Sequence, residues 1–165
     1  MILVVLLGIL LGSYALLTTL ARFPRFVWLE PGLRGRVSLA LLLAFTGLGH
    51  FVKTDAMAAM LPAWVPLRVP LIHATGVLEL AGAGGLLVPG LSRAAGWCII
   101  AFLVAVFPAN VYAALHRVEM GGHESGPIYL AVRGPFQALL AWWAWWFAVR
   151  VPEDRDRFAG PAPPA

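Results

Sequence analysis

Residues 70–89 read PLIHATGVLELAGAGGLLVP, an apolar stretch between two prolines that is long enough to cross a bilayer. A single carboxylate, Glu79, lies near the middle of this stretch. At a helical rise of about 1.5 Å per residue, Glu79 lies about 13 Å from Pro70, close to the centre of a membrane. A carboxylate at that depth is costly to insert, so it is usually paired, protonated or functional. The stretch therefore predicts a membrane-spanning fold with a polar site inside it.

The composition of the whole chain supports a membrane protein. Of its 165 residues, 61% are hydrophobic and 12% are charged, whereas soluble domains average about 45–50% apolar and about 25% charged residues. The basic residues lie in short connections, which is typical of headgroup anchors, and we expect no nucleic-acid binding. The single cysteine, Cys98, excludes an intramolecular disulfide and a C-x-x-C redox pair.

Five apolar segments predict an all-α membrane protein with five spans, at about residues 2–20, 37–52, 70–88, 94–115 and 129–149. The first segment has neither a basic start nor an evident cleavage site, so we expect a membrane helix rather than a removed signal peptide. A short interfacial helix is expected over residues 55–61. The chain then divides into an N-terminal transmembrane helix (1–21), a basic cytoplasmic loop (22–36), a four-helix transmembrane domain (37–150) and a disordered, proline-rich tail (151–165).

The distribution of Lys and Arg predicts the orientation of these spans. Most of the basic residues lie in the first connection, in the turn at residues 89–93 and in the C-terminal tail. The positive-inside rule then places the N-terminus outside the cell and the C-terminus in the cytoplasm. The tryptophans near the end of the last span are expected to anchor it at the inner interface; they are Trp142, Trp143, Trp145 and Trp146.

In this orientation, the polar residues of four spans fall in the outer half of the membrane. We expect them to form a polar funnel that opens outward, with Glu79 at its base. Glu79, His50 and His73 are the candidate catalytic residues, because carboxyl and imidazole groups exchange protons. The candidate ligand-binding residues are Thr75, Asn110, Arg133 and Gln137. Each of the funnel residues also has a plain structural alternative, such as a helix-end hydrogen bond, an interhelical bond or a side chain that reaches the headgroups.

A second polar cluster lies in the outer connection around Gly121 and Gly122. His116, Glu119 and His123 are weak candidates for metal ligands, because imidazole and carboxylate groups suit Zn²⁺ or Cu²⁺. Their spacing matches no established metal site. We therefore expect a solvated loop here and predict no metal.

Several short motifs together resemble the DoxX-like family of small bacterial integral membrane proteins. They are GLGHF at residues 47–51, Pro62 and Pro66, GVLELAG at 76–82, FPAN at 107–110 and RGPFQ at 133–137. The resemblance covers about residues 37–147 and implies a four-helix bundle in the bacterial plasma membrane, preceded here by one extra helix. It also implies an association with redox chemistry, since relatives in that family include a subunit of a thiosulfate:quinone oxidoreductase. The matching positions are His50, Glu79, Asn110, Arg133 and Gln137.

Three functional hypotheses follow from the sequence. In the first, the funnel binds a small amphiphile such as a quinone, and the protein is a redox-linked subunit of a partner oxidoreductase. In the second, the protein is a non-catalytic partner that stabilises or helps to assemble another membrane or exported protein. In the third, it performs proton-coupled transport, for which an oligomer would be needed, or lipid-directed chemistry. The chain shows no Gly-rich fingerprint for flavin or nicotinamide phosphates, so a redox role requires a quinone, a partner subunit or a metal.

Overall fold

The structure, a computed structural model, describes residues 2–150, and every regular element in that part of the chain is a helix. This confirms the expected all-helical fold for the described residues. Four helical segments are long and apolar enough to cross a membrane: Ile2–Leu20, Pro31–Val52, Arg68–Leu87 and Ser92–Leu115. The predicted tail at residues 151–165 lies outside the described residues.

The first of these segments combines three consecutive elements: α1 (Ile2–Leu7), the π-helical η1 (Gly8–Gly12) and α2 (Ser13–Leu20). The other three are α3 (Pro31–Val52), α5 (Arg68–Leu87) and α6 (Ser92–Leu115). The fifth predicted span is also helical, but it consists of α7 (Leu130–Ala144) followed by the π-helical η4 (Trp145–Arg150), and it is not among the four. Three short helices lie in the connections: η2 (Pro24–Phe26), α4 (Thr54–Ala58) and η3 (His123–Tyr129).

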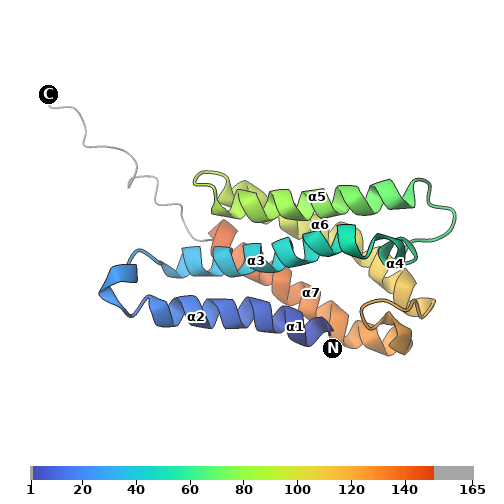
Figure 1. Ribbon diagram of the computed structural model, residues 1–165, viewed down its shortest axis with the longest axis horizontal. Coiled ribbons are helices and arrows are strands. Elements are labelled where there is room, and N and C mark those ends of the chain that lie inside the picture. Colours follow the sequence, from blue (N-terminus) through green and yellow to red (C-terminus); the bar gives the residue numbers. More distant parts are fainter. Residues whose placement is uncertain (1, 151–165) are drawn as a thin grey trace, which may run out of the picture.

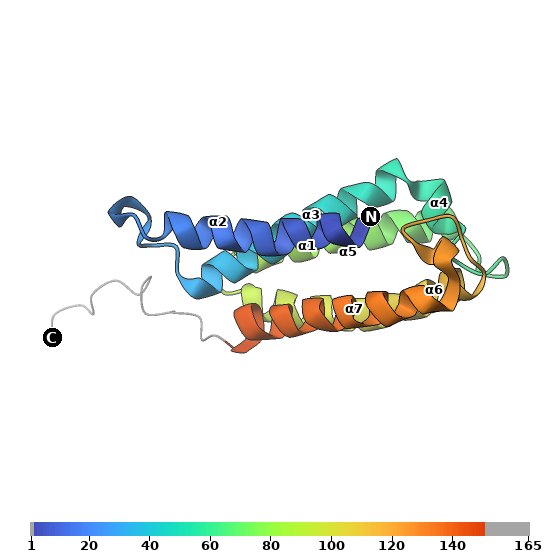
Figure 2. The ribbon, with the colours of Figure 1, turned by 90° about the horizontal axis from the view of Figure 1, so that it is seen from below.

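The long helices lie roughly side by side in a bundle (Figure 1). Figure 2 shows two layers, with α1, α2, α3 and α5 in one layer and α6 and α7 in the other. The side chains of Leu10, Leu39, Leu42 and Leu86 are almost completely buried in the hydrophobic core. Both views place α4 and η3 at the same end of the bundle, which we call the α4 end.

The N-terminal helix is part of the core of this bundle. Leu10 has no exposed surface, and the ring of Tyr14 lies 5.3 Å from the ring of Trp143 and 5.4 Å from that of Phe147, centroid to centroid. These contacts join the beginning of the chain to its last helix. The helix therefore packs as a full member of the bundle.

The basic loop predicted over residues 22–36 is too long, because α3 begins at Pro31 rather than at Val37. Proline is favoured at the first position of a helix, where its missing N–H leaves no hydrogen bond unmade. Gly35 then allows close packing, since a Cβ on this residue would lie 2.1 Å from the ring of Phe147. Two basic residues assigned to the loop, Arg34 and Arg36, therefore lie within the first turns of α3.

Two further expectations need correction. Trp143 is buried, with 5% of its surface exposed, and its Nε1–H donates to the Gly35 carbonyl oxygen at 3.0 Å. It is a core residue, whereas Trp142, Trp145 and Trp146 are exposed. The helix predicted at residues 55–61 is shorter, because α4 ends at Ala58 and the chain continues through the tighter bonds from Met60 N–H to the Met57 carbonyl and from Leu61 N–H to the Ala58 carbonyl.

Candidate functional site

A cavity of about 440 Å³ lies among α3, α5, α6 and α7 near the α4 end of the bundle. Most of its wall is apolar. Its polar lining residues come from all four helices and are Thr46, His50, Thr75, Glu79, Asn110 and Arg133. The structure thus brings together five of the seven residues that the sequence placed in a funnel, and it adds Thr46.

His50 and Glu79 face each other across the contact between α3 and α5. The Nε2 atom of His50 lies 3.6 Å from Oε1 of Glu79, and the two side chains are only 15% and 12% exposed. The Nδ1 atom of His50 lies 3.1 Å from the Ile72 carbonyl oxygen and 3.0 Å from the hydroxyl of Thr75. The hydroxyl of Thr75 donates its own hydrogen to the same Ile72 carbonyl at 2.8 Å, so these contacts assign the imidazole proton of His50 to Nδ1.

This tautomer has a consequence for the pair. A neutral imidazole with its proton on Nδ1 presents a lone pair at Nε2, and an ionised Glu79 presents lone pairs at Oε1. These two atoms face each other inside the bundle, and a proton between them would join the imidazole of His50 to the carboxyl group of Glu79.

Glycines on both helices explain why these side chains come so close. A Cβ on Gly76 of α5 would lie 2.8 Å from the Cβ of His50 and 3.1 Å from the Gly47 carbonyl oxygen. A Cβ on Gly47 of α3 would lie 3.2 Å from the Cβ of Glu79. Small residues of this kind allow transmembrane helices to approach backbone to backbone. The close crossing of α3 and α5 thus places His50 beside Glu79.

The opposite wall of the cavity is formed by α6 and α7. The Nε–H of Arg133 donates to Oδ1 of Asn110 at 3.2 Å, and the Nδ2 amide of Asn110 donates to the Val106 carbonyl at 3.1 Å. Asn110 is 6% exposed, so the guanidinium of Arg133 has its hydrogen-bond acceptor in the interior of the bundle.

Two polar atoms of this site are buried and have no hydrogen-bond partner among the described residues: Oε2 of Glu79 and Nη1 of Arg133. Buried polar atoms normally have a partner, and an unsatisfied one is unfavourable. One of these atoms is an acceptor or acid group and the other is a donor. The cavity therefore offers a complementary pair of polar contacts to a bound molecule.

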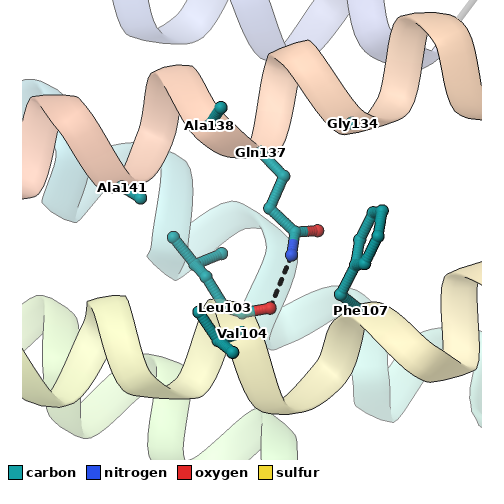
Figure 3. A pocket seen from close by; sticks show the side chains of 7 residues that line it. All are labelled: Leu103, Val104, Phe107, Gly134, Gln137, Ala138 and Ala141. Carbon is teal, nitrogen blue, oxygen red and sulfur yellow. Dashed lines mark hydrogen bonds between the residues drawn. The ribbon is translucent and has the colours of Figure 1, made fainter.

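Two predicted site residues lie outside this cavity. His73 is exposed, its Nε2 lies 3.2 Å from the hydroxyl of Thr54, and its ring stacks on Phe51 with the centroids 5.4 Å apart. Gln137 is buried between α6 and α7, where its Nε2 amide donates to the Leu103 carbonyl (Figure 3). The rotation of each helix about its own axis directs both side chains away from the cavity.

The connection between α6 and α7 does not assemble the three weak metal candidates. Within residues 2–150, no group of three or more His, Cys, Asp or Glu side chains is placed to hold a metal ion. His116 is exposed and stacks on Tyr112, with the ring centroids 3.9 Å apart. His123 is buried, contacts the Met120 carbonyl through Nδ1 at 2.6 Å and packs edge-on against Tyr129.

The sequence missed the residues that cover the cavity. Met57, Met60 and Leu61 line it from α4 and the turn that follows. Their helical spacing predicted an apolar face toward the lipid headgroups, and the same spacing is compatible with a face toward a cavity. Only the contact between α4 and α5 distinguishes the two.

Comparison with known proteins identifies a family but no function. No curated protein and no solved structure matches the chain. Residues 39–148 match the sequence profile described as Domain of unknown function (DUF8561). The matched range contains every residue that lines the cavity and excludes the N-terminal helix. The chain therefore belongs to the DUF8561 family.

Proposed function

We propose that this protein is a redox-linked membrane subunit whose cavity binds the headgroup of a quinone-type amphiphile. The observation that carries the proposal is the pair of buried, unpartnered atoms in the same cavity, Oε2 of Glu79 and Nη1 of Arg133. A quinone oxygen accepts a hydrogen bond from a guanidinium, and a quinol hydroxyl donates one to a carboxylate. The cavity presents both kinds of partner.

The shape and lining of the cavity support this ligand class. Its volume of about 440 Å³ falls within the range of about 300–1,000 Å³ that is usual for small-molecule sites. Apolar side chains, among them Leu78, Phe102 and Val106, suit a ring and the start of an isoprenoid tail. The few polar groups are positioned to orient the oxygens of the ring.

The His50–Glu79 pair suits the proton balance of quinone chemistry. Reduction of a quinone to a quinol takes two electrons and two protons, one proton for each oxygen. The imidazole of His50 and the carboxyl group of Glu79 line the cavity together and can relay protons from water to the two ring oxygens. The electrons would come from a partner oxidoreductase subunit, in keeping with the redox association of the DoxX-like proteins that the sequence resembles.

The proposal includes the bacterial plasma membrane and an orientation in it. Arg22, Arg25, Arg93 and Arg150 lie at the end of the bundle opposite the α4 end, and the positive-inside rule assigns that end to the cytoplasm. The cavity then lies in the outer half of the membrane. The N-terminus is outside and the C-terminus is cytoplasmic.

Mass spectrometry of molecules that copurify with the detergent-solubilised protein tests the proposal. We expect a quinone to be retained by the wild type and by His73→Ala, since His73 lies outside the cavity. Glu79→Gln should lose it, and a short-chain quinone added to this variant should bind at least tenfold more weakly than to the wild type. Equal retention by Glu79→Gln would reject the proposal. A protein partner that copurifies with all three proteins, in the absence of any quinone, would instead favour an assembly role.

A further inference from the structure

A second recess, which we call the Gln137 groove, lies between α6 and α7 (Figure 3). Its volume is about 240 Å³, and it shares no lining residue with the cavity. Small residues of α7, Gly134, Ala138 and Ala141, form one wall. Val104 and Ala138 are exposed, so the groove opens on the lipid-facing surface of the bundle.

One polar side chain is aimed into this groove. Gln137 is only 7% exposed, and its Nε2 amide donates to the Leu103 carbonyl. Because that carbonyl accepts hydrogen bonds only, the amide nitrogen must face it, and this fixes the direction of the amide oxygen. The oxygen Oε1 is buried and has no partner among the described residues. Figure 3 shows it directed toward the space beside Phe107.

The backbone of α6 is altered beside the groove. Pro108 has no N–H, so the carbonyl of Val104, four residues earlier in α6, lacks the donor that a regular helix would supply. Val104 is itself a lining residue of the groove. The buried acceptor in this apolar recess is Oε1 of Gln137, to which the described residues supply no donor.

We propose that the Gln137 groove binds an apolar molecule with a hydroxyl group, which enters from the bilayer and donates its hydrogen bond to Oε1 of Gln137. The acceptor selects a donor-bearing ligand, and the apolar walls select a hydrophobic body. The groove volume of about 240 Å³ exceeds the roughly 150 Å³ of an apolar protein cavity that takes up benzene. An aromatic alcohol is thus a suitable probe.

The test is ¹⁹F NMR titration of the full-length protein in detergent micelles with 4-fluorophenol, using empty micelles as the baseline. 4-Fluoroanisole is the matched control, because methylation removes the hydroxyl donor and leaves the ring. We expect 4-fluorophenol to bind the wild type at least tenfold more tightly than 4-fluoroanisole does. Gln137→Leu should weaken 4-fluorophenol binding at least tenfold and leave 4-fluoroanisole binding nearly unchanged.

A second variant keeps the test decisive if Gln137→Leu does not fold. Ala138→Leu fills the groove from an exposed position and leaves Gln137 in place, and it should also weaken 4-fluorophenol binding. His73→Ala changes a residue that lines neither the groove nor the cavity and should bind the probe like the wild type. Equal binding of both probes to the wild type, or unchanged binding in Ala138→Leu, would overturn the proposal. A loss of binding in Glu79→Gln alone would place the probe in the cavity and would also overturn it.

Discussion

Glu79 and Arg133 are the carboxylate and the guanidinium that line the cavity, and each is partly without a hydrogen-bond partner. No ion pair joins the two residues directly, since Glu79 contacts His50 and Arg133 contacts Asn110. Each is a polar group in a mostly apolar cavity, so the loss of one leaves the other with fewer polar groups around it.

We therefore predict that Glu79→Leu and Arg133→Leu each lower the free energy of unfolding by about 1–3 kcal/mol. The double variant should lose clearly less than the sum of the two single losses. Denaturant unfolding in detergent measures all four proteins in one double-mutant cycle. Additive single effects would show that the two charges act independently across the cavity.

His123 is expected to make the free energy of unfolding depend on pH. Burial of its side chain lowers the pKa below the usual 6.5, the nearby Arg133 lowers it further, and the Met120 carbonyl and Glu124 act in the opposite direction. The unfolded chain then binds more protons than the folded protein between that lowered pKa and 6.5. The free energy of unfolding should consequently fall as the pH drops below about 6.5.

The variant His123→Phe retains an aromatic ring against Tyr129 and removes the titrating group. We expect its melting temperature to change less between pH 7.5 and 5 than that of the wild type, by an amount set by the His123 pKa shift alone. Thermal unfolding at a series of pH values measures this. Parallel pH profiles for the two proteins would contradict the prediction, since His50, His73 and His116 are common to both.

At the scale of the helices, the close contact between α3 and α5 depends on Gly76. A Cβ at this position would lie 2.8 Å from the Cβ of His50 and 3.1 Å from a backbone oxygen of α3, so the helices would have to separate. We predict that Gly76→Ala lowers the free energy of unfolding by about 1–3 kcal/mol. It should also weaken quinone binding, because it displaces His50 from Glu79.

Gly84 on the same helix provides the matched control. A Cβ there has no atom within 4 Å, so Gly84→Ala should be neutral or stabilising by up to about 1 kcal/mol. Unfolding in detergent compares the two variants directly. Equal effects would mean that helix propensity, rather than the contact between α3 and α5, determines the response at Gly76.

For the whole molecule, the orientation in the membrane is the main testable property. Lys53 is exposed at the α4 end, and Arg93 is exposed at the opposite end. In a Cys98→Ala background, we predict that K53C reacts with a membrane-impermeant maleimide added to intact spheroplasts. R93C should react only after permeabilisation. The reverse labelling pattern would invert the orientation and place the cavity in the inner half of the membrane.

The sequence alone determined which segments are helical and apolar, and it determined the position of each polar residue along its helix. Hydropathy and the fixed helical rise are local properties, so residues 70–89 were sufficient to place Glu79 near the centre of a span. The same reasoning placed His50, Asn110 and Arg133 near one end of the bundle, where the structure has them. It missed the start of α3, because the basic residues of its first turns resemble a loop in composition.

Only the tertiary structure decided which of these residues meet. Spacing along a helix does not fix the rotation of that helix about its own axis. In this protein, contacts between residues far apart in the sequence determine the rotation of the helices. Gly76 of α5 packs against His50 of α3, and Gly35 of α3 packs against Phe147 of the last helix. Those contacts bring His50 and Glu79 into one cavity, leave His73 exposed and place Gln137 in a groove of its own.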